Sequence, residues 1–166
     1  MPLLPRRLIL LVLALSALLA VAGCGSDSEE PASTSTPEAA AAPERTKPEI
    51  TVPKGKAPKK LVIKDIEEGT GKAAKSGDQV TVQYVGTSFL NGRQFDASWD
   101  RGEPFQFELG AGAVIPGWDQ GVEGMKVGGR RQLVIPPDLA YGRQGSAPTI
   151  GPNETLVFVV DLVDAG

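Results

Sequence analysis

Residues 114–122 decide the fold of this chain, and they read Val114-Ile115-Pro116-Gly117-Trp118-Asp119-Gln120-Gly121-Val122. From this stretch onward, large apolar residues recur at the spacing of one helix face: Ile115, Trp118, Val122 and Met125. Pro116 suits the first turn of a helix, and Gly124 or Gly128 would end it. We therefore predict one short helix of about two or three turns at this position.

The segments on both sides of this helix have the period-two alternation of half-buried strands. Asn91-Gly92 lies between two such runs and is a strong hairpin signal. The last run is almost continuously apolar, which favours a central place in the sheet. Together the segments predict an α+β fold in which an antiparallel sheet covers one helix. Its strands are expected around 61–66, 80–85, 93–95, 104–109, 131–135 and 156–163.

The composition excludes several classes of function. The chain has 166 residues, a formal net charge of −3, one cysteine and no histidine. Without histidine, neither a His-ligated metal site nor a Ser–His–Asp or Cys–His triad can be built. A single cysteine cannot form a disulfide within the chain. The slightly acidic balance offers no electrostatic reason to expect a nucleic-acid partner.

Residues 1–23 are predicted to be a lipoprotein signal peptide. Arg6 and Arg7 precede a fifteen-residue apolar run, Leu8 to Ala22, which is short for a membrane-spanning helix. Small residues precede the only cysteine, in an arrangement that resembles a bacterial lipobox: Val21-Ala22-Gly23-Cys24. We expect cleavage before Cys24, a diacylglycerol on its thiol, and a protein anchored at the extracytoplasmic face of the cell membrane. The alternative is an ordinary signal peptide with an incidental cysteine.

Residues 24–60 are predicted to be a disordered linker, and residues 61–166 a single folded domain. The linker is rich in Ala, Pro, Ser, Thr, Glu and Lys, with a proline at every fifth or sixth position from Pro31 to Pro58. Such a composition buries too little apolar surface to offset the entropy lost on ordering. The remaining residues are a normal number for one compact domain.

No single motif within the domain is enough by itself to indicate a function. Gly110-Ala111-Gly112 lacks the further glycine and the Gly-Lys-Ser/Thr of nucleotide-binding loops. Carboxylate pairs such as Asp96 with Asp100 are most simply read as solvated surface groups. Each aromatic residue on an alternating strand is, taken alone, a core residue.

The motifs taken together resemble the FKBP-type peptidyl-prolyl cis-trans isomerases. They occur in the family's order across residues 61–162: Val82-Gln83-Tyr84-Val85-Gly86, Gly92-Arg93-Gln94-Phe95-Asp96-Ala97-Ser98, Pro104-Phe105-Gln106-Phe107, the stretch 114–122, Ala140-Tyr141-Gly142 and Thr155-Leu156-Val157-Phe158. The resemblance implies a five-stranded antiparallel sheet wrapped around one short helix.

The resemblance also implies an aromatic-lined hollow between helix and sheet. Trp118 would be its floor, and the Ile115 N–H and the Tyr141 hydroxyl would donate hydrogen bonds to ligand carbonyls. Residues with an implied catalytic role are Tyr84, Phe95, Asp96, Tyr141 and Phe158. Residues with an implied substrate-binding role are Arg101 (paired with Asp96), Phe105, Val114, Ile115, Trp118 and Ile150. This chain departs from frequent family residues mainly in the long loop that carries Ile150, at Ser146, Thr149 and Gly151, and also at Ala113 before the helix motif.

The implied function is non-covalent peptidyl-prolyl isomerisation in exported proteins, with no cofactor and no metal. The partners implied are unfolded or folding proline-containing chains and macrolides such as tacrolimus and rapamycin. A membrane contact through the lipid anchor and a monomeric state are also expected. The alternative from another class is a chaperone module that binds proline-containing segments with little or no catalysis.

Overall fold

The computed structural model describes residues 45–166. The predicted signal peptide, Cys24 and the linker as far as residue 44 lie outside the described residues. None of the helices in the described part has the length and apolar character needed to cross a membrane.

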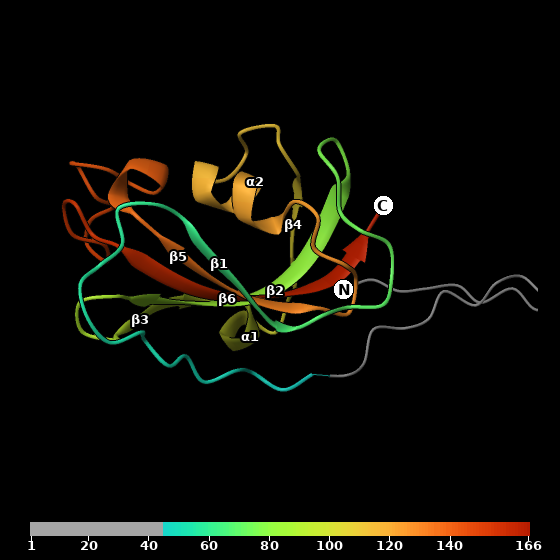
Figure 1. Ribbon diagram of the computed structural model, residues 1–166, viewed down its shortest axis with the longest axis horizontal. Coiled ribbons are helices and arrows are strands. Elements are labelled where there is room, and N and C mark those ends of the chain that lie inside the picture. Colours follow the sequence, from blue (N-terminus) through green and yellow to red (C-terminus); the bar gives the residue numbers. More distant parts are fainter. Residues whose placement is uncertain (1–44) are drawn as a thin grey trace, which may run out of the picture. The chain divides into compact units, whose positions relative to one another are not determined.

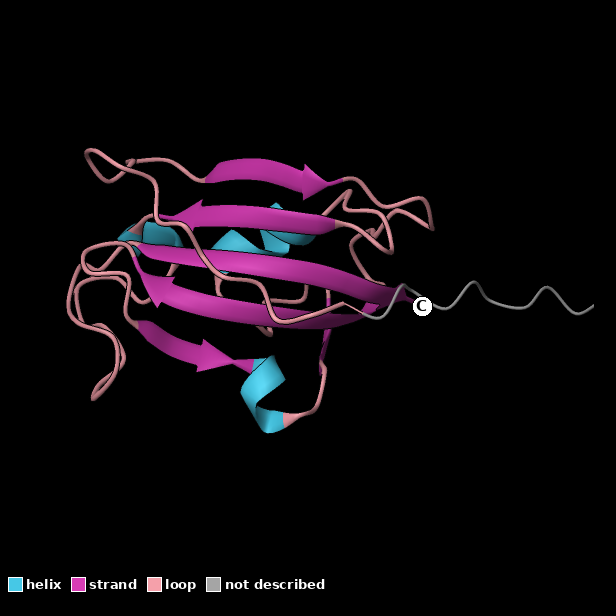
Figure 2. Ribbon diagram, turned by 90° about the horizontal axis from the view of Figure 1, so that it is seen from below, coloured by secondary structure: helices cyan, strands magenta, loops and turns pink. Residues whose placement is uncertain are grey.

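One antiparallel sheet forms the body of the domain (Figures 1 and 2). Its strands run in the lateral order β1-β5-β6-β2-β3, with β4 also paired to β2. The apolar β6 lies between β5 and β2, and this confirms its predicted central position. The strand bounds are β1 Val62–Glu67, β2 Gln79–Ser88, β3 Gln94–Ala97, β4 Phe105–Glu108, β5 Arg130–Ile135 and β6 Leu156–Ala165.

The sheet has six strands, as many as the sequence pattern predicts, rather than the five that the family resemblance implied, because one edge is divided. β3 pairs with β2 at Val85–Thr87, and β4 pairs with the same side of β2 at Gln79–Val82. Between these two stretches, the Tyr84 N–H donates to the Ser98 hydroxyl at 2.8 Å. A buried side chain thus replaces the backbone partner of Tyr84, and the chain leaves the sheet there as the helix α1 (Ser98–Arg101). α1 is a second short helix that the sequence analysis did not predict.

The helix α2 (Pro116–Val122) covers one face of the sheet, as predicted (Figure 1). Proline occupies its first turn, and Gly124 follows its end with φ +75°. Two glycines allow the close approach of α2 to β5. A Cβ atom on Gly117 would lie 2.4 Å from the Ile135 side chain, and one on Gly121 would lie 2.7 Å from that of Leu133. A 3-10 turn, η1 (Pro137–Leu139), follows β5.

Residues 45–60, here called the strap, correct the expected boundary of the linker. The strap contains no helix or strand, but it runs along the sheet face opposite α2 (Figure 1). Arg130 donates to the Thr46 carbonyl at 3.0 Å, and Gln132 donates to the Thr51 carbonyl at 3.2 Å. The expectation of a solvated tether therefore fails for these sixteen residues. Polar contacts with side chains of β5 and β6, rather than apolar burial alone, hold the strap in place.

Arg45 at the start of the strap makes the most buried of these contacts. Its guanidinium donates to the Gly128 carbonyl, lies 3.4 Å from the carboxylate of Asp161 on β6, and lies 2.8 Å from that of Glu67. The Asp161 side chain is only 3% exposed and also receives two hydrogen bonds from Arg130, at 2.6 and 2.8 Å. A buried carboxylate is stable only when it is paired in this way.

Candidate active site

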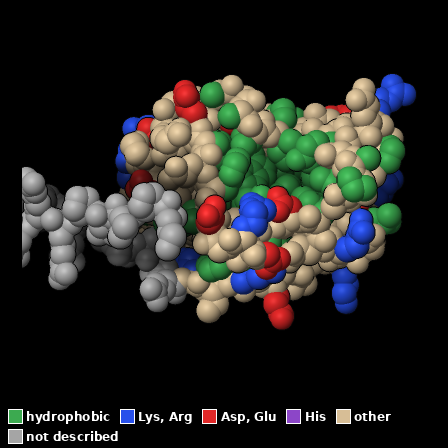
Figure 3. Space-filling view, turned by 180° about the vertical axis from the view of Figure 1, so that it is seen from behind, with side chains coloured by type: hydrophobic (Ala, Val, Ile, Leu, Met, Phe, Trp, Pro, Cys, Tyr) green, Lys and Arg blue, Asp and Glu red, His purple; other side chains and the backbone are tan. Residues whose placement is uncertain are grey.

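A hollow of about 400 Å³ opens between α2 and the sheet, and its apolar lining is visible in Figure 3. Side chains from five elements and two loops converge on it because the short α2 crosses a curved, twisted sheet. The lining residues are Tyr84, Phe95, Asp96, Phe105, Ala113, Val114, Ile115, Trp118, Tyr141 and Phe158.

Trp118 on α2 is the centre of the aromatic cluster. Its ring lies 5.0 Å from that of Tyr84 on β2 and 5.3 Å from that of Phe158 on β6, both nearly perpendicular to it. Phe105 on β4 meets it edge-on at 6.1 Å. Edge-to-face contacts of this kind are favourable and hold each ring in one orientation. The hollow therefore has rigid aromatic walls before any ligand binds.

Gly86 on β2 makes room for the remaining wall. A Cβ atom at this position would lie 2.7 Å from both Phe158 and Phe95. The absence of a side chain allows these two rings to meet edge-on, with centroids 5.5 Å apart. The glycine in the motif that ends at residue 86 thus has a packing role that the sequence analysis did not identify.

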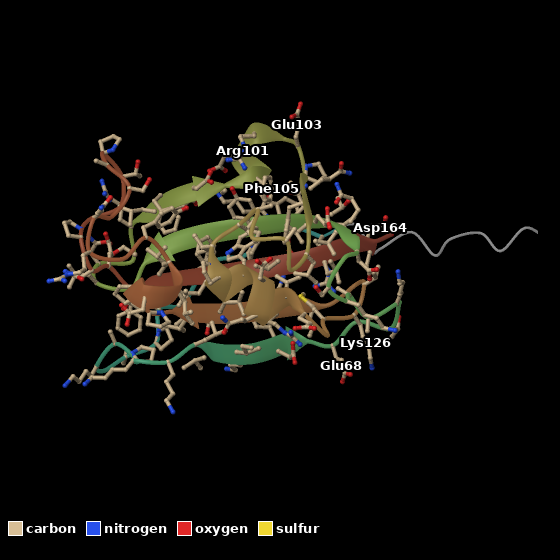
Figure 4. All side chains as sticks on the ribbon, turned by 90° about the horizontal axis from the view of Figure 1, so that it is seen from above. Glu68, Arg101, Glu103, Phe105, Lys126 and Asp164 are labelled. Atoms are coloured by element: carbon tan, nitrogen blue, oxygen red, sulfur yellow. The ribbon has the colours of Figure 1, made fainter. Side chains whose placement is uncertain are left out.

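Asp96 is the only charged residue among those that line the hollow in the described part of the chain, and it is held by two partners. The Tyr84 hydroxyl and the Arg101 guanidinium both donate to its carboxylate. Arg101 also donates to the Tyr84 oxygen at 2.9 Å, and its guanidinium carbon lies 5.6 Å from the centre of that ring. In Figure 4, Arg101 and Phe105 lie on the side of the domain formed by α1 and β4.

This network sets the ionisation of Tyr84. Burial, followed by the hydrogen bond to Asp96, raises the pKa of Tyr84 to about 12. The hydrogen bond to Tyr84 is the main reason why the pKa of Arg101 is raised. At neutral pH the tyrosine is therefore a neutral donor and the arginine a cation. Asp96 is bonded to both, so its carboxylate is positioned rather than free to rotate.

Two hydrogen-bond donors at the hollow have no partner within residues 45–166. These are the Ile115 N–H, which precedes α2, and the hydroxyl of the half-exposed Tyr141. Burial raises the pKa of Tyr141, so its hydroxyl keeps its proton at neutral pH. Both groups are available to a bound carbonyl, as the resemblance implied.

Asp119 organises the loop that carries Ala113 and Val114 to the hollow. Its carboxylate accepts hydrogen bonds from the Gly110 N–H at 2.9 Å and from the Gly112 N–H at 3.2 Å. Both glycines have positive φ, at +79° and +70°, so the loop turns sharply before α2. Asp119 belongs to the helix motif 114–122, but no pattern in the sequence indicates this role.

The structure brings the expected site residues together, with two differences. Arg101 does not line the hollow but stands behind Asp96 and Tyr84. Ile150 is 7% exposed and packs in the hydrophobic core, in the loop after Tyr141, rather than lining the hollow. Ala113 lines it although it was not among the expected site residues. Cys24 lies outside the described residues.

The chemistry available at the site is that of binding and orientation. Within the described residues, no group of three or more His, Cys, Asp or Glu side chains could hold a metal ion. An apolar hollow with two neutral donors and one fixed carboxylate suits an uncharged segment rich in carbonyl groups.

Comparisons with known proteins agree on one family. The family model for FKBP-type peptidyl-prolyl cis-trans isomerases matches residues 70–163. An FK506-binding protein of Streptomyces anulatus is 60% identical over 118 residues, which cover 70% of this chain and 95% of that protein. A probable FK506-binding protein of Corynebacterium glutamicum is 52% identical over 119 residues, covering 72% and 98% of the two chains. The crystal structure of FkpA from Escherichia coli matches with a TM-score of 0.58 and 50% identity, covering 63% of this chain and 47% of that one.

Proposed function

This chain belongs to the family of FKBP-type peptidyl-prolyl cis-trans isomerases, and from that premise we propose that it accelerates Xaa-Pro bond rotation in exported proteins by binding the prolyl segment in the aromatic hollow. The observation that carries the proposal is the set of rigid rings around Trp118, joined by donors at Ile115 and Tyr141. The prolyl ring would lie against the rings, and the donors would hold the flanking carbonyls.

The rate gain would come from differential binding rather than from proton or group transfer. Rotation about the prolyl amide is slow because amide resonance resists it, with a barrier of about 20 kcal/mol. The twisted amide is less conjugated and less polar at its oxygen than the planar one. An apolar hollow therefore disfavours the planar state more than the twisted one. Each 1.4 kcal/mol or so of such a difference gives about tenfold in rate.

Asp96 has a positioning role in this scheme. Because Tyr84 and Arg101 both donate to it, the carboxylate stays at one side of the hollow and keeps the Tyr84 ring in place. A fixed charge beside an apolar hollow also orients the amide dipole of a bound segment. No step requires that Asp96 accept a proton from the substrate.

A protease-coupled isomerisation assay on residues 39–166 tests the proposal. The described residues 45–166 belong to one compact unit, and the matching region covers 95% of the Streptomyces relative, so we expect this part to fold as a separate chain. We expect faster cis-trans exchange of a proline peptide, and a large loss in Phe158→Ala with the exposed Leu90→Ala as a matched control. Binding of the peptide without any acceleration would contradict isomerisation and favour the chaperone alternative.

Macrolide binding is the second part of the proposal. Relatives in two bacterial genera carry the name FK506-binding protein, and this chain has the aromatic hollow described above. We expect tacrolimus to compete with the proline peptide and to quench the fluorescence of Trp118. Uncompetitive inhibition, or no effect of tacrolimus on activity, would place its binding elsewhere or exclude it.

We also propose that the protein is exported and attached to the membrane through a lipid on Cys24. The support is the signal-peptide pattern that ends at the only cysteine of the chain. Mass spectrometry of the membrane-bound protein should find an N-terminal Cys24 that carries acyl chains. Cys24→Ser should release the protein from the membrane fraction. An unmodified Cys24, or an uncleaved N-terminus, would refute the anchor and leave the isomerase proposal intact.

A further inference from the structure

Four exposed lysines gather at one end of the domain, around the turn between β2 and β3. They all belong to the strap, which ends just before β1: Lys54, Lys56, Lys59 and Lys60. The strap segment 52–57 and the turn 89–92 line the same surface depression. In Figure 4 the strap, coloured teal, carries side chains that end in nitrogen and point away from the domain. We call the four lysines together with the turn 89–92 the basic end.

The basic end gathers four positive charges on a chain whose formal net charge is −3. Among the ion pairs of residues 45–166, none involves any of the four lysines. Two carboxylates are close by. Glu154 lines a neighbouring depression and accepts a hydrogen bond from the Gly151 N–H at 2.6 Å, and Glu49 lies five residues before Lys54 on the strap. The excess of positive charge at this end remains free to attract an anionic partner.

An apolar side chain projects from the middle of this charge. Leu90 at the tip of the turn is 85% exposed, the largest exposure among the big hydrophobic residues of the described chain. A turn that exposes one leucine beside several lysines matches the interface of an anionic bilayer, where leucine enters the acyl boundary and lysines remain among the headgroup phosphates. From this geometry we propose that the basic end docks on membranes that contain anionic lipid.

A lipid surface fits these observations better than a nucleic acid does. Binding of single-stranded nucleic acid without sequence preference uses exposed aromatic rings for stacking, and Phe89 in this turn is half-buried. The chain as a whole is acidic, so a long polyanion would be repelled beyond the basic end. A flat anionic bilayer contacts only the end that faces it.

Docking would place the active site beside the membrane. Arg93, which follows the turn, donates to the Thr149 carbonyl at 3.1 Å, and Thr149 belongs to the loop after Tyr141. The basic end therefore adjoins the loop that borders the hollow. A docked domain would meet chains as they emerge at the membrane surface. This inference depends on the surface alone and does not require either isomerase activity or the lipid on Cys24.

Co-sedimentation of residues 39–166 with lipid vesicles tests the proposal. We expect binding to vesicles of phosphatidylcholine and phosphatidylglycerol in equal parts, weak binding to phosphatidylcholine alone, and release by added salt. Each lysine near an anionic surface contributes about fivefold to the partition coefficient, so K54Q/K56Q should lower it about 25-fold. Leu90→Ser should lower it about tenfold. All variants should keep the circular dichroism spectrum of the unaltered chain.

Lys75→Gln is the matched control. Lys75 is exposed and lies before β2, at the end of that strand opposite the turn, so its loss should leave vesicle binding unchanged. Equal binding by K54Q/K56Q and the unaltered chain, or equal binding to both vesicle types, would overturn the proposal. Unchanged binding of Leu90→Ser would refute insertion of the turn. Binding to duplex DNA or polyglutamate without binding to vesicles would assign the basic end to a different partner.

Discussion

Replacing Arg45 by alanine tests whether the strap is part of the folded domain. Its guanidinium donates to the Gly128 carbonyl, and its side chain is only 15% exposed. A hydrogen bond from a charged donor contributes about 1.5–3 kcal/mol. The pair with Glu67 adds less than about 1 kcal/mol, because that carboxylate is 57% exposed. Asp161 keeps both hydrogen bonds from Arg130, so no unpaired buried charge is created.

We therefore expect Arg45→Ala to lower the free energy of unfolding by about 2 kcal/mol, which corresponds to a fall in Tm of roughly 10 °C for a domain of this size. Denaturant titration followed by the fluorescence of Trp99 and Trp118 measures the first value, and calorimetry measures the second. Limited trypsin digestion should cut the variant sooner within the strap, after the lysines at 54–60. Peptide turnover should be unaffected, because the strap lies on the sheet face opposite α2.

Lys47→Ala is the matched control for this variant. Lys47 is also on the strap, but its pair with Asp100 is exposed on both sides, at 38% and 52%, so its loss should cost less than about 0.5 kcal/mol. If Arg45→Ala were as stable as Lys47→Ala and as the unaltered chain, the contacts of Arg45 would not hold the strap against the sheet. The strap would then be the solvated linker that its composition predicts.

Further predictions concern the site. Tyr141→Phe should lower kcat/KM for a proline peptide by about two- to tenfold without changing stability, since its hydroxyl has no partner within the described residues; equal turnover would exclude it as a donor. Asp119→Ala should loosen the loop before α2 and lower kcat/KM severalfold, while Asp119→Asn should recover part of it; unchanged kinetics in both would argue against a positioning role. Gly121→Ala should cost about 1–3 kcal/mol of stability in denaturant titration, because its methyl group would meet Leu133. The pKa values of Tyr84 and Tyr141 are both raised, so both hydroxyls stay protonated to higher pH than a free tyrosine, and kcat/KM should be flat from neutrality to about pH 10; a transition near neutrality would reveal an unidentified titrating group.

Local sequence patterns were sufficient to predict the strands and the helix whose burial follows a regular period. Alternation predicted β2, β4, β5 and β6, the Asn91-Gly92 hairpin signal predicted β3, and the spacing around Trp118 predicted α2 within a few residues. The motif set also identified nearly all residues of the hollow, because each motif contains a residue that faces it. Ile150 packs into the core in the structure, and its role at the hollow stays a prediction, because a loop residue has no periodicity that shows which way it points.

The sequence by itself determined the α+β class and the position of the helix, because apolar periodicity encodes which face of each element is buried. The aromatic residues of the site followed from the resemblance of the ordered motifs to one family, and not from periodicity. Only the tertiary structure decided how polar groups pair across long separations. Ser98 divides an edge of the sheet by taking the Tyr84 N–H, and Arg45 meets Asp161 across 116 positions of the chain. Such pairs depend on strand register and on the path of the chain over the sheet, and no local pattern carries that information. The same contacts move the start of the folded domain from residue 61 to the strap.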